Sequence, residues 1–171
     1  MKQTWPQAYG FVRKSEGGND DDKADHGGRT SRGITQREYD AWRVKQGLPL
    51  QDVWLASEQE IETIYHDNYW EPNCDALPAG PDYLLFDFNV NAGPHRATVT
   101  LQRALGIADD GVFGPKTLAA VQSANASDLI ENFSAEKISF YEALNQPRFI
   151  HGWLNRVAEV KANALTMIGV D

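Results

Sequence analysis

The sequence has a single cysteine, few basic residues and no long apolar run, and each shortage excludes a class of protein. Cys74 is the only cysteine among 171 residues, so no internal disulfide can form and the fold does not depend on an oxidising compartment. Lysine and arginine number 16 against 24 acidic residues, which gives a net charge of −8. This balance argues against nucleic acid as a partner, because phosphates require a basic face, and against attachment to anionic membranes. No segment approaches the roughly 18 apolar residues that span a bilayer, so we expect no stable membrane insertion.

The sequence also lacks the features of a metal site and of a secretory signal. Its four histidines are scattered, with no two at metal-ligand spacing, and the turn at Asp109-Asp110-Gly111 does not continue into the ligand spacing of an EF-hand. We therefore expect no metal and no cofactor. Residues 1–6 contain no apolar core of a signal peptide, so we expect synthesis in the bacterial cytoplasm.

Helical patterning covers most of the chain. Residues 5–15 predict a first helix, which Gly17-Gly18 ends. Thr35-x-x-Glu38 and Ser57-x-x-Glu60 are capping boxes, each of which predicts a helix start. The polar, glycine-rich stretch between the first helix and Thr35 predicts a loop with a small hairpin at residues 29–34. We therefore predict a mainly helical fold that includes a small β-hairpin.

Glu16 has the position expected of a catalytic acid. Cleavage of a glycosidic bond requires a carboxylic acid that stays protonated near neutral pH. Glu16 lies at the end of the first predicted helix, where the negative end of the dipole disfavours an ionised carboxylate. Arg29 and Arg32 would favour the ionised form of Glu16, and so oppose the helix dipole, if they came near its carboxylate.

Asp25 and Thr30 lie in the loop that follows. An Asp there can orient or activate a water molecule, and a Thr hydroxyl can hold that water or the Asp. The alternative is structural, with Asp25 in an Asx turn and Thr30 as an ordinary hairpin residue. Spacing alone does not decide between the two.

Three residues farther along the chain are candidates for substrate binding. Trp70 can stack on a sugar ring or belong to the core, and Asn89 and Asn91 can bind N-acetyl groups or cap a helix. For Asn91 we favour the cap slightly.

Several motifs, taken together, resemble glycoside hydrolase family 108, the muramidases common in phages and prophages. The first block is Glu16-Gly17-Gly18, then Ala24-Asp25-x-Gly27-Gly28-x-Thr30, then Gly33-Ile34-Thr35. The second is Asp87-Phe88-x-Val90-Asn91-x-Gly93-Pro94. Leu101 to Gly106 and Asp109 to Leu118 resemble the predicted peptidoglycan-binding region that usually follows. The chain departs from the family at Asn19, where a tyrosine is usual, and has four residues between Asp25 and Thr30 where the wider phage-lysozyme pattern has five.

The resemblance implies a fold, a reaction and a biological setting. The fold would be lysozyme-like (α+β, mainly α), with a catalytic region at residues 1–93 and a helical peptidoglycan-binding region at residues 94–171. Glu16 would be the catalytic acid of an N-acetylmuramidase, acting on peptidoglycan with Asp25 and Thr30. The protein would be a monomeric phage endolysin that reaches the periplasm or cell wall through a holin.

Three alternatives remain open at this stage. The same chemistry could serve a secreted antibacterial effector, whose partner would be an immunity protein. The fold could serve a non-catalytic peptidoglycan-binding module, although such a module has no use for an acid at the position of Glu16. An amidase or peptidase acting on the peptide stems is the third.

Overall fold

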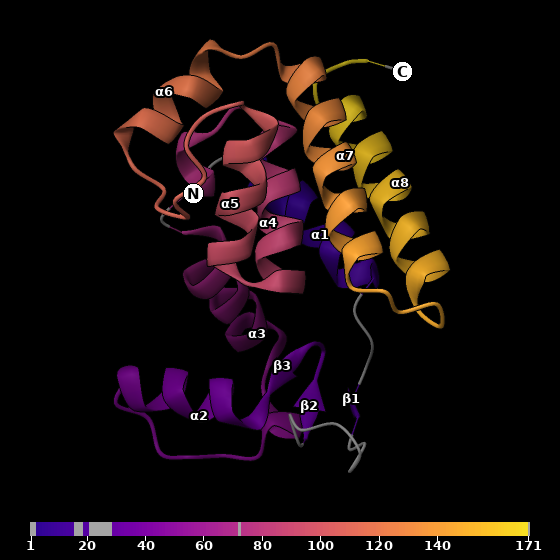
Figure 1. The fold of residues 1–171 in the computed structure, drawn as a ribbon. Coiled ribbons are helices and arrows are strands. Elements are labelled where there is room, and N and C mark those ends of the chain that lie inside the picture. Colours follow the sequence, from indigo (N-terminus) through magenta and orange to yellow (C-terminus); the bar gives the residue numbers. More distant parts are fainter. Residues whose placement is uncertain (1–2, 16–18, 21–28, 72, 171) are drawn as a thin grey trace. The chain divides into compact units, whose positions relative to one another are not determined.

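The computed structural model describes residues 3–15, 19–20, 29–71 and 73–170, which form two compact units, residues 1–68 and 69–171. Helices predominate in both units, and a small antiparallel sheet lies in the first (Figure 1). The predicted fold class, mainly helical with a small β-hairpin, is confirmed. The predicted division at residue 93 does not coincide with the division between the compact units. The prediction that residues 1–93 are catalytic and residues 94–171 bind peptidoglycan concerns function rather than compactness, and it stays a prediction.

The first unit contains helices α1, α2 and α3 and three short strands. Its elements are α1 (Trp5–Ser15), β1 (Asn19–Asp20), β2 (Thr30–Ser31), β3 (Ile34–Thr35), α2 (Gln36–Lys45), the 3-10 turn Val53–Leu55 and α3 (Glu58–Tyr65). The strands pair antiparallel in the order β1-β2-β3, with Thr30 opposite Thr35 and Ser31 opposite Ile34. The predicted first helix and the predicted hairpin are both present.

Both capping boxes form as predicted. At the start of α2, the Glu38 amide donates to Thr35 Oγ1 at 3.2 Å and the Thr35 amide donates to Glu38 Oε2 at 2.9 Å. At the start of α3, Ser57 and Glu60 exchange the equivalent bonds at 3.2 and 2.8 Å. Each box satisfies two amides that have no partner inside the helix, so the two helices begin at fixed residues.

The second unit is built around α4. Its elements are the 3-10 turn Cys74–Ala76, α4 (Pro81–Ala92), α5 (Pro94–Ala104), α6 (Pro115–Ser123), α7 (Ala126–Ala143) and α8 (Ile150–Met167). Every residue of α4 from Pro81 to Asn89 is buried, as expected of a helix that is covered on all sides by α5, α7 and α8. Gly80, just before α4, has φ 85°, and a Cβ there would lie 2.9 Å from the Ala164 carbonyl oxygen of α8. Glycine is therefore required for this close approach.

A buried charge network joins three helices of this unit. Asp87 of α4 accepts hydrogen bonds from Arg156 of α8, at 3.1 Å from Nε and 2.9 Å from Nη2, and from Lys137 Nζ of α7. The side chains of Asp87 and Lys137 are 1% and 2% exposed. Burial lowers the pKa of Lys137, and the neighbouring carboxylate of Asp87 opposes that change. In this network two cations therefore share one buried carboxylate.

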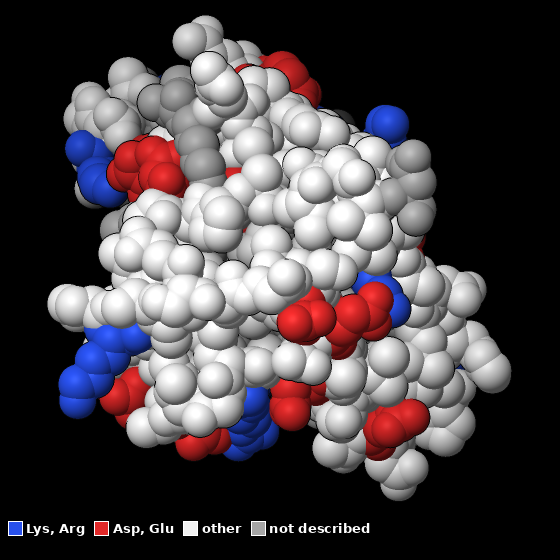
Figure 2. Space-filling model, turned by 90° about the horizontal axis from the view of Figure 1, so that it is seen from above, with Lys and Arg blue, Asp and Glu red and all other residues white. Residues whose placement is uncertain are grey.

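Charge on the visible surface is dispersed. On the face shown in Figure 2, acidic and basic side chains are scattered among a larger area of uncharged residues. Among the described residues on this face no broad basic patch is seen, in keeping with the net charge of −8. None of the described helices combines the length and the apolar character needed to cross a membrane.

Candidate active site

The predicted catalytic residues fall partly outside the structure. Glu16 and Asp25 lie outside the described residues, so their geometry is not part of the site described below. Thr30 lies in β2, and the end of α1, immediately before Glu16, is described. The described segments next to Glu16 and Asp25 in the sequence are the last turn of α1 and the β2–β3 hairpin, and the start of α3 contacts both.

The hairpin turn has an unusual backbone. Its two central residues, Arg32 and Gly33, have φ angles of 51° and 83°. Positive φ at both positions is the geometry of a type I′ hairpin turn, which favours glycine or asparagine rather than a long side chain. Contacts with α3 and the segment before it hold Arg32 there: Tyr65 Oη donates to its carbonyl at 2.9 Å, and its Nη2 donates to the Ala56 carbonyl at 2.5 Å.

Glu58 gathers the side chains of three segments. Its Oε2 accepts a bond from Arg32 Nη1 at 2.9 Å, and its Oε1 accepts from Tyr9 Oη at 3.1 Å and from Arg13 Nε at 3.3 Å. Tyr9 and Arg13 belong to α1, Arg32 to the hairpin and Glu58 to the first turn of α3. Arg13 Nη1 is buried and has no hydrogen-bond partner among the described residues. Glu58 thus ties the end of α1 to the hairpin, the two segments that flank Glu16 and Asp25 in the sequence.

The contacts of Glu58 change the pKa of two groups. Partial burial by itself would raise the pKa of Glu58, but hydrogen bonds from Arg32, Tyr9 and Arg13 outweigh it and hold that pKa below its ordinary value. Burial, followed by the charge of Glu58, raises the pKa of Tyr9 well above its ordinary value. At neutral pH Glu58 is therefore ionised and Tyr9 is a neutral donor.

The lowered pKa of Glu58 predicts a pH-dependent contribution to stability. A carboxyl whose pKa is lower in the folded state stabilises the fold above its unfolded pKa and loses that contribution as pH falls through the folded pKa. Because the Glu58 side chain is 58% exposed, solvent screening keeps the contribution below about 1 kcal/mol. We expect Glu58→Gln to lower the urea midpoint at pH 7 and to have little effect near pH 3.

Glu142→Gln, a change at an exposed position on α7, is the matched control and should alter the midpoint little at either pH. The interpretation is wrong if Glu58→Gln lowers the midpoint by the same amount at pH 7 and pH 3, because the effect would then not depend on ionisation.

An exposed tryptophan that the sequence did not single out contacts the hairpin from the 3-10 turn Val53–Leu55. Trp54 Nε1 donates to the Thr30 carbonyl at 3.0 Å, and Arg29 lies over the Trp54 ring at 4.1 Å while also pairing with Asp52. Trp54 is 37% exposed. It is a better placed aromatic residue for sugar contact than Trp70, and its only signal in the sequence was Asp52, which caps the turn around it.

The predicted substrate-binding residues lie in the second unit. Trp70 is 0% exposed and donates its Nε1 to Asp75 Oδ1 at 2.5 Å. Asn89 is 3% exposed, and its Nδ2 donates to the Tyr69 carbonyl at 2.6 Å. Asn91 is exposed and bonds the Asp87 carbonyl four residues back at 2.7 Å, within α4 rather than as its cap. Their roles in sugar binding stay predictions, and Trp70 would have to leave its present position to offer a ring face.

Comparison with known proteins identifies relatives of both halves of the chain. Residues 9–93 match the family model described as glycosyl hydrolase 108, and residues 96–158 match the model described as a predicted peptidoglycan domain. A solved structure titled "Structure of Brucella abortus SagA" is 35% identical in sequence, with a TM-score of 0.83 over 96% of this chain and 95% of that one. A comparison with curated proteins gave no match. The first model spans Glu16, Asp25, Thr30 and the Glu58 cluster.

Proposed function

The chain belongs to glycosyl hydrolase family 108, and we propose that it is an N-acetylmuramidase, which hydrolyses the β-1,4 bond between N-acetylmuramic acid and N-acetylglucosamine in peptidoglycan. The family supports a glycosidase, and the predicted peptidoglycan domain at residues 96–158 supports peptidoglycan as the polymer it acts on. The match of both models to one chain is the observation that carries the proposal.

The proposed reaction assigns one role to each residue of the motif. Glu16 donates its proton to the glycosidic oxygen as the bond from that oxygen to the anomeric carbon of N-acetylmuramic acid breaks. Water adds its hydroxyl to that carbon and gives its other proton to a carboxylate, Asp25 or the ionised Glu16, and Asp25 orients the water or stabilises the developing positive charge. Thr30 holds the water or the Asp25 carboxylate. The products are a new reducing end and a free 4-hydroxyl.

Mass spectrometry of purified peptidoglycan after digestion tests this function against its alternatives. A muramidase releases fragments that end in reducing N-acetylmuramic acid. An amidase or peptidase would release free peptides with the glycan intact. A binding module without activity would leave the polymer unchanged, and either of the last two results would overturn the proposal.

Asp25 and Thr30 are expected to differ in importance. We expect Asp25→Asn to reduce the release of reducing ends by at least about tenfold, because the amide cannot take a proton from water or balance a positive charge. Thr30→Ala should have a milder effect, since the spacing from Asp25 departs from the wider pattern and the Thr30 carbonyl, which bonds Trp54, is retained. Near-normal activity of Asp25→Asn would show that Asp25 only shapes the loop.

We further propose that the protein is a phage endolysin, and that it depends on other proteins for access to the cell wall. The net charge is −8, and both basic side chains of α8 are engaged by acids, Arg156 by Asp87 and Lys161 by Glu131 at 2.5 Å. Little positive charge is therefore available for attraction to an anionic outer surface. A secreted antibacterial effector is the second candidate, and co-purification with a bound immunity protein would favour it.

Added from outside, the protein should lyse chloroform-permeabilised Gram-negative cells quickly and intact cells poorly. A turbidity assay on both kinds of cell, at two salt concentrations, measures the difference. Equal lysis of intact and permeabilised cells would contradict the proposal, because the protein would then cross the outer membrane unaided.

A further inference from the structure

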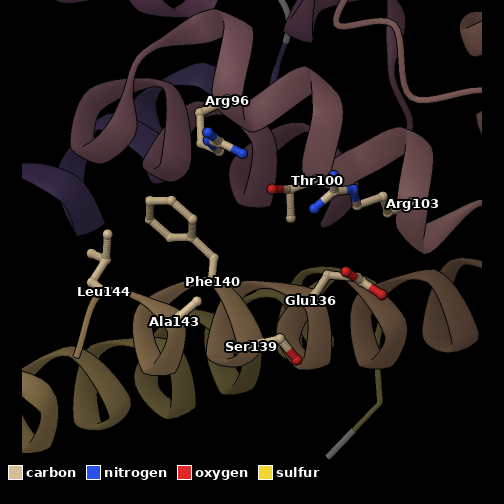
Figure 3. A pocket seen from close by; sticks show the side chains of 8 residues that line it. All are labelled: Arg96, Thr100, Arg103, Glu136, Ser139, Phe140, Ala143 and Leu144. Atoms are coloured by element: carbon tan, nitrogen blue, oxygen red, sulfur yellow. The ribbon is translucent and has the colours of Figure 1, made fainter.

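A groove lies between α5 and α7 of the second unit. It has a volume of about 320 Å³ and is lined along one side by α5 and along the other by α7 (Figure 3). Arg96, Thr100 and Arg103 line the α5 side, and their spacing of four and three residues puts them on one face of the helix. Glu136, Ser139 and Phe140 line the facing side of α7.

The two arginines have donors to spare. The Arg96 guanidinium lies 5.1 Å from the centre of the Phe140 ring, and within the part of the chain that the structure describes it pairs with no carboxylate. Arg103 donates from Nε to Asp109 at 2.7 Å, and both side chains of that pair are about half exposed, at 50% and 45%. The planar fork of each guanidinium suits a carboxylate, which can accept two bonds from it.

The position of Arg96 works against the stability of its own helix. Arg96 lies in the first turn of α5, which contains no acidic residue, and a cation there opposes the positive end of the helix dipole. An anion bound beside it would gain from both the guanidinium and the helix dipole. A chain with a net charge of −8 thus places two cations on one wall of a groove, opposed by Glu136 in the lining and by Asp109, which pairs with Arg103.

We propose that the α5–α7 groove binds the carboxylates of the peptide stems of peptidoglycan, with Arg96 and Arg103 as the recognising groups. This rests on the proposed function, because it takes peptidoglycan as the polymer. The glycan strands consist of N-acetylated sugars, and the stem amidates the lactyl carboxyl of each N-acetylmuramic acid, so negative charge in the intact polymer resides on the peptides. Along α5 the two arginines are seven residues apart, roughly 10 Å, about the length of three extended residues. The groove therefore fits a short peptide with two carboxylates, while Thr100 and Ser139 face its amide groups.

Fluorescence anisotropy of the full-length chain with a synthetic stem tetrapeptide tests the proposal. The probe is L-Ala-γ-D-Glu-meso-diaminopimelate-D-Ala, with the fluorophore on the L-Ala amine, the position that is acylated in the wall. Arg96→Gln with Arg103→Gln should weaken binding by at least about tenfold, as expected for the loss of charge-assisted hydrogen bonds. Lysine at both positions keeps the charge but loses the two-pronged geometry, and should restore part of the affinity.

The matched control removes the same two charges elsewhere in the unit. Lys116 and Arg148 are exposed, and neither lines the groove. Lys116→Gln with Arg148→Gln should leave binding of the tetrapeptide unchanged. Unlabelled tetrapeptide should compete with the probe, and oligomers of N-acetylglucosamine, which carry no carboxylate, should not.

Three results would overturn the proposal: no binding of the tetrapeptide at millimolar concentration, equal weakening by the control pair, or competition by oligomers of N-acetylglucosamine. Release of reducing ends from intact peptidoglycan, measured in parallel, separates this failure from failure of the proposed function. A chain that releases reducing ends without binding the tetrapeptide contradicts only the groove, whereas a chain that binds the tetrapeptide and releases none contradicts only the muramidase reaction.

Discussion

Replacement of Glu16 by glutamine should reduce the release of reducing ends from peptidoglycan by about two to four orders of magnitude while leaving the fold intact. Glutamine keeps the shape of the side chain but has no acidic proton to give to the leaving oxygen. Glu16 is the next residue in the sequence after α1, which ends at Ser15, and it lies within the residues that match glycosyl hydrolase 108.

The main electrostatic objection to this role is weakened by the structure. Arg29 and Arg32 follow Glu16 in the sequence and would favour its ionised form if their charges were uncompensated. Arg29 pairs with Asp52, and Arg32 pairs with Glu58 at 2.9 Å. Both cations thus have carboxylate partners within the first unit, which reduces their capacity to stabilise a further anion.

Glu142→Gln serves as the matched control for Glu16→Gln and should retain full activity. Circular dichroism and the urea midpoint show whether each variant is folded. Near-normal release of reducing ends by a folded Glu16→Gln would show that another group is the acid. The proposed function would survive that result, because the identity of the sugar at the new reducing end, established by fragmentation of the reduced products, shows which bond was cleaved whichever residue donates the proton.

Features that depend on neighbours in the sequence were predictable. Thr35 with Glu38, and Ser57 with Glu60, form capping boxes because each pair exchanges hydrogen bonds across three residues. The hairpin around Gly33 follows from a glycine where a tight turn needs positive φ. These elements rest on local chemistry, so the sequence contains all the information they need.

Features that depend on distant partners were not predictable. Arg32 and Glu58 are 26 residues apart, and nothing in the sequence marks Glu58 as the residue that joins α1 to the hairpin. Trp70 follows a helical stripe that ends in a π-helical turn at His66–Trp70. Such a turn shifts the direction of the side chains that follow it, so the helical periodicity before it does not indicate which way Trp70 points. Its burial depends on packing against Phe86, with ring centres 5.5 Å apart.

The buried network of Asp87, Lys137 and Arg156 is the most distant of these associations, with partners 50 and 69 residues apart. It predicts an unequal cost of removing its members. Asp87→Asn removes the carboxylate that Lys137, 2% exposed, and Arg156, 18% exposed, both contact, and loss of one partner from a buried ion pair costs about 3–5 kcal/mol. Lys137→Met leaves Asp87 and Arg156 as a balanced pair, and the methionine replaces much of the lysine stem with apolar volume. We therefore expect Lys137→Met to cost less than half as much as Asp87→Asn.

Urea denaturation of the two variants, followed by circular dichroism, measures the difference. For a slope of about 1–3 kcal/mol per molar, Asp87→Asn should lower the midpoint by on the order of 2 M. Glu159→Gln removes an exposed negative charge from α8 and should shift it little. If Lys137→Met is as damaging as Asp87→Asn, Lys137 stabilises the unit by more than its charge. Asp87→Asn could instead shift the urea midpoint no more than the Glu159→Gln control does. The attraction within the network would then only offset the cost of burying its charges, and apolar packing alone would hold α4, α7 and α8 together.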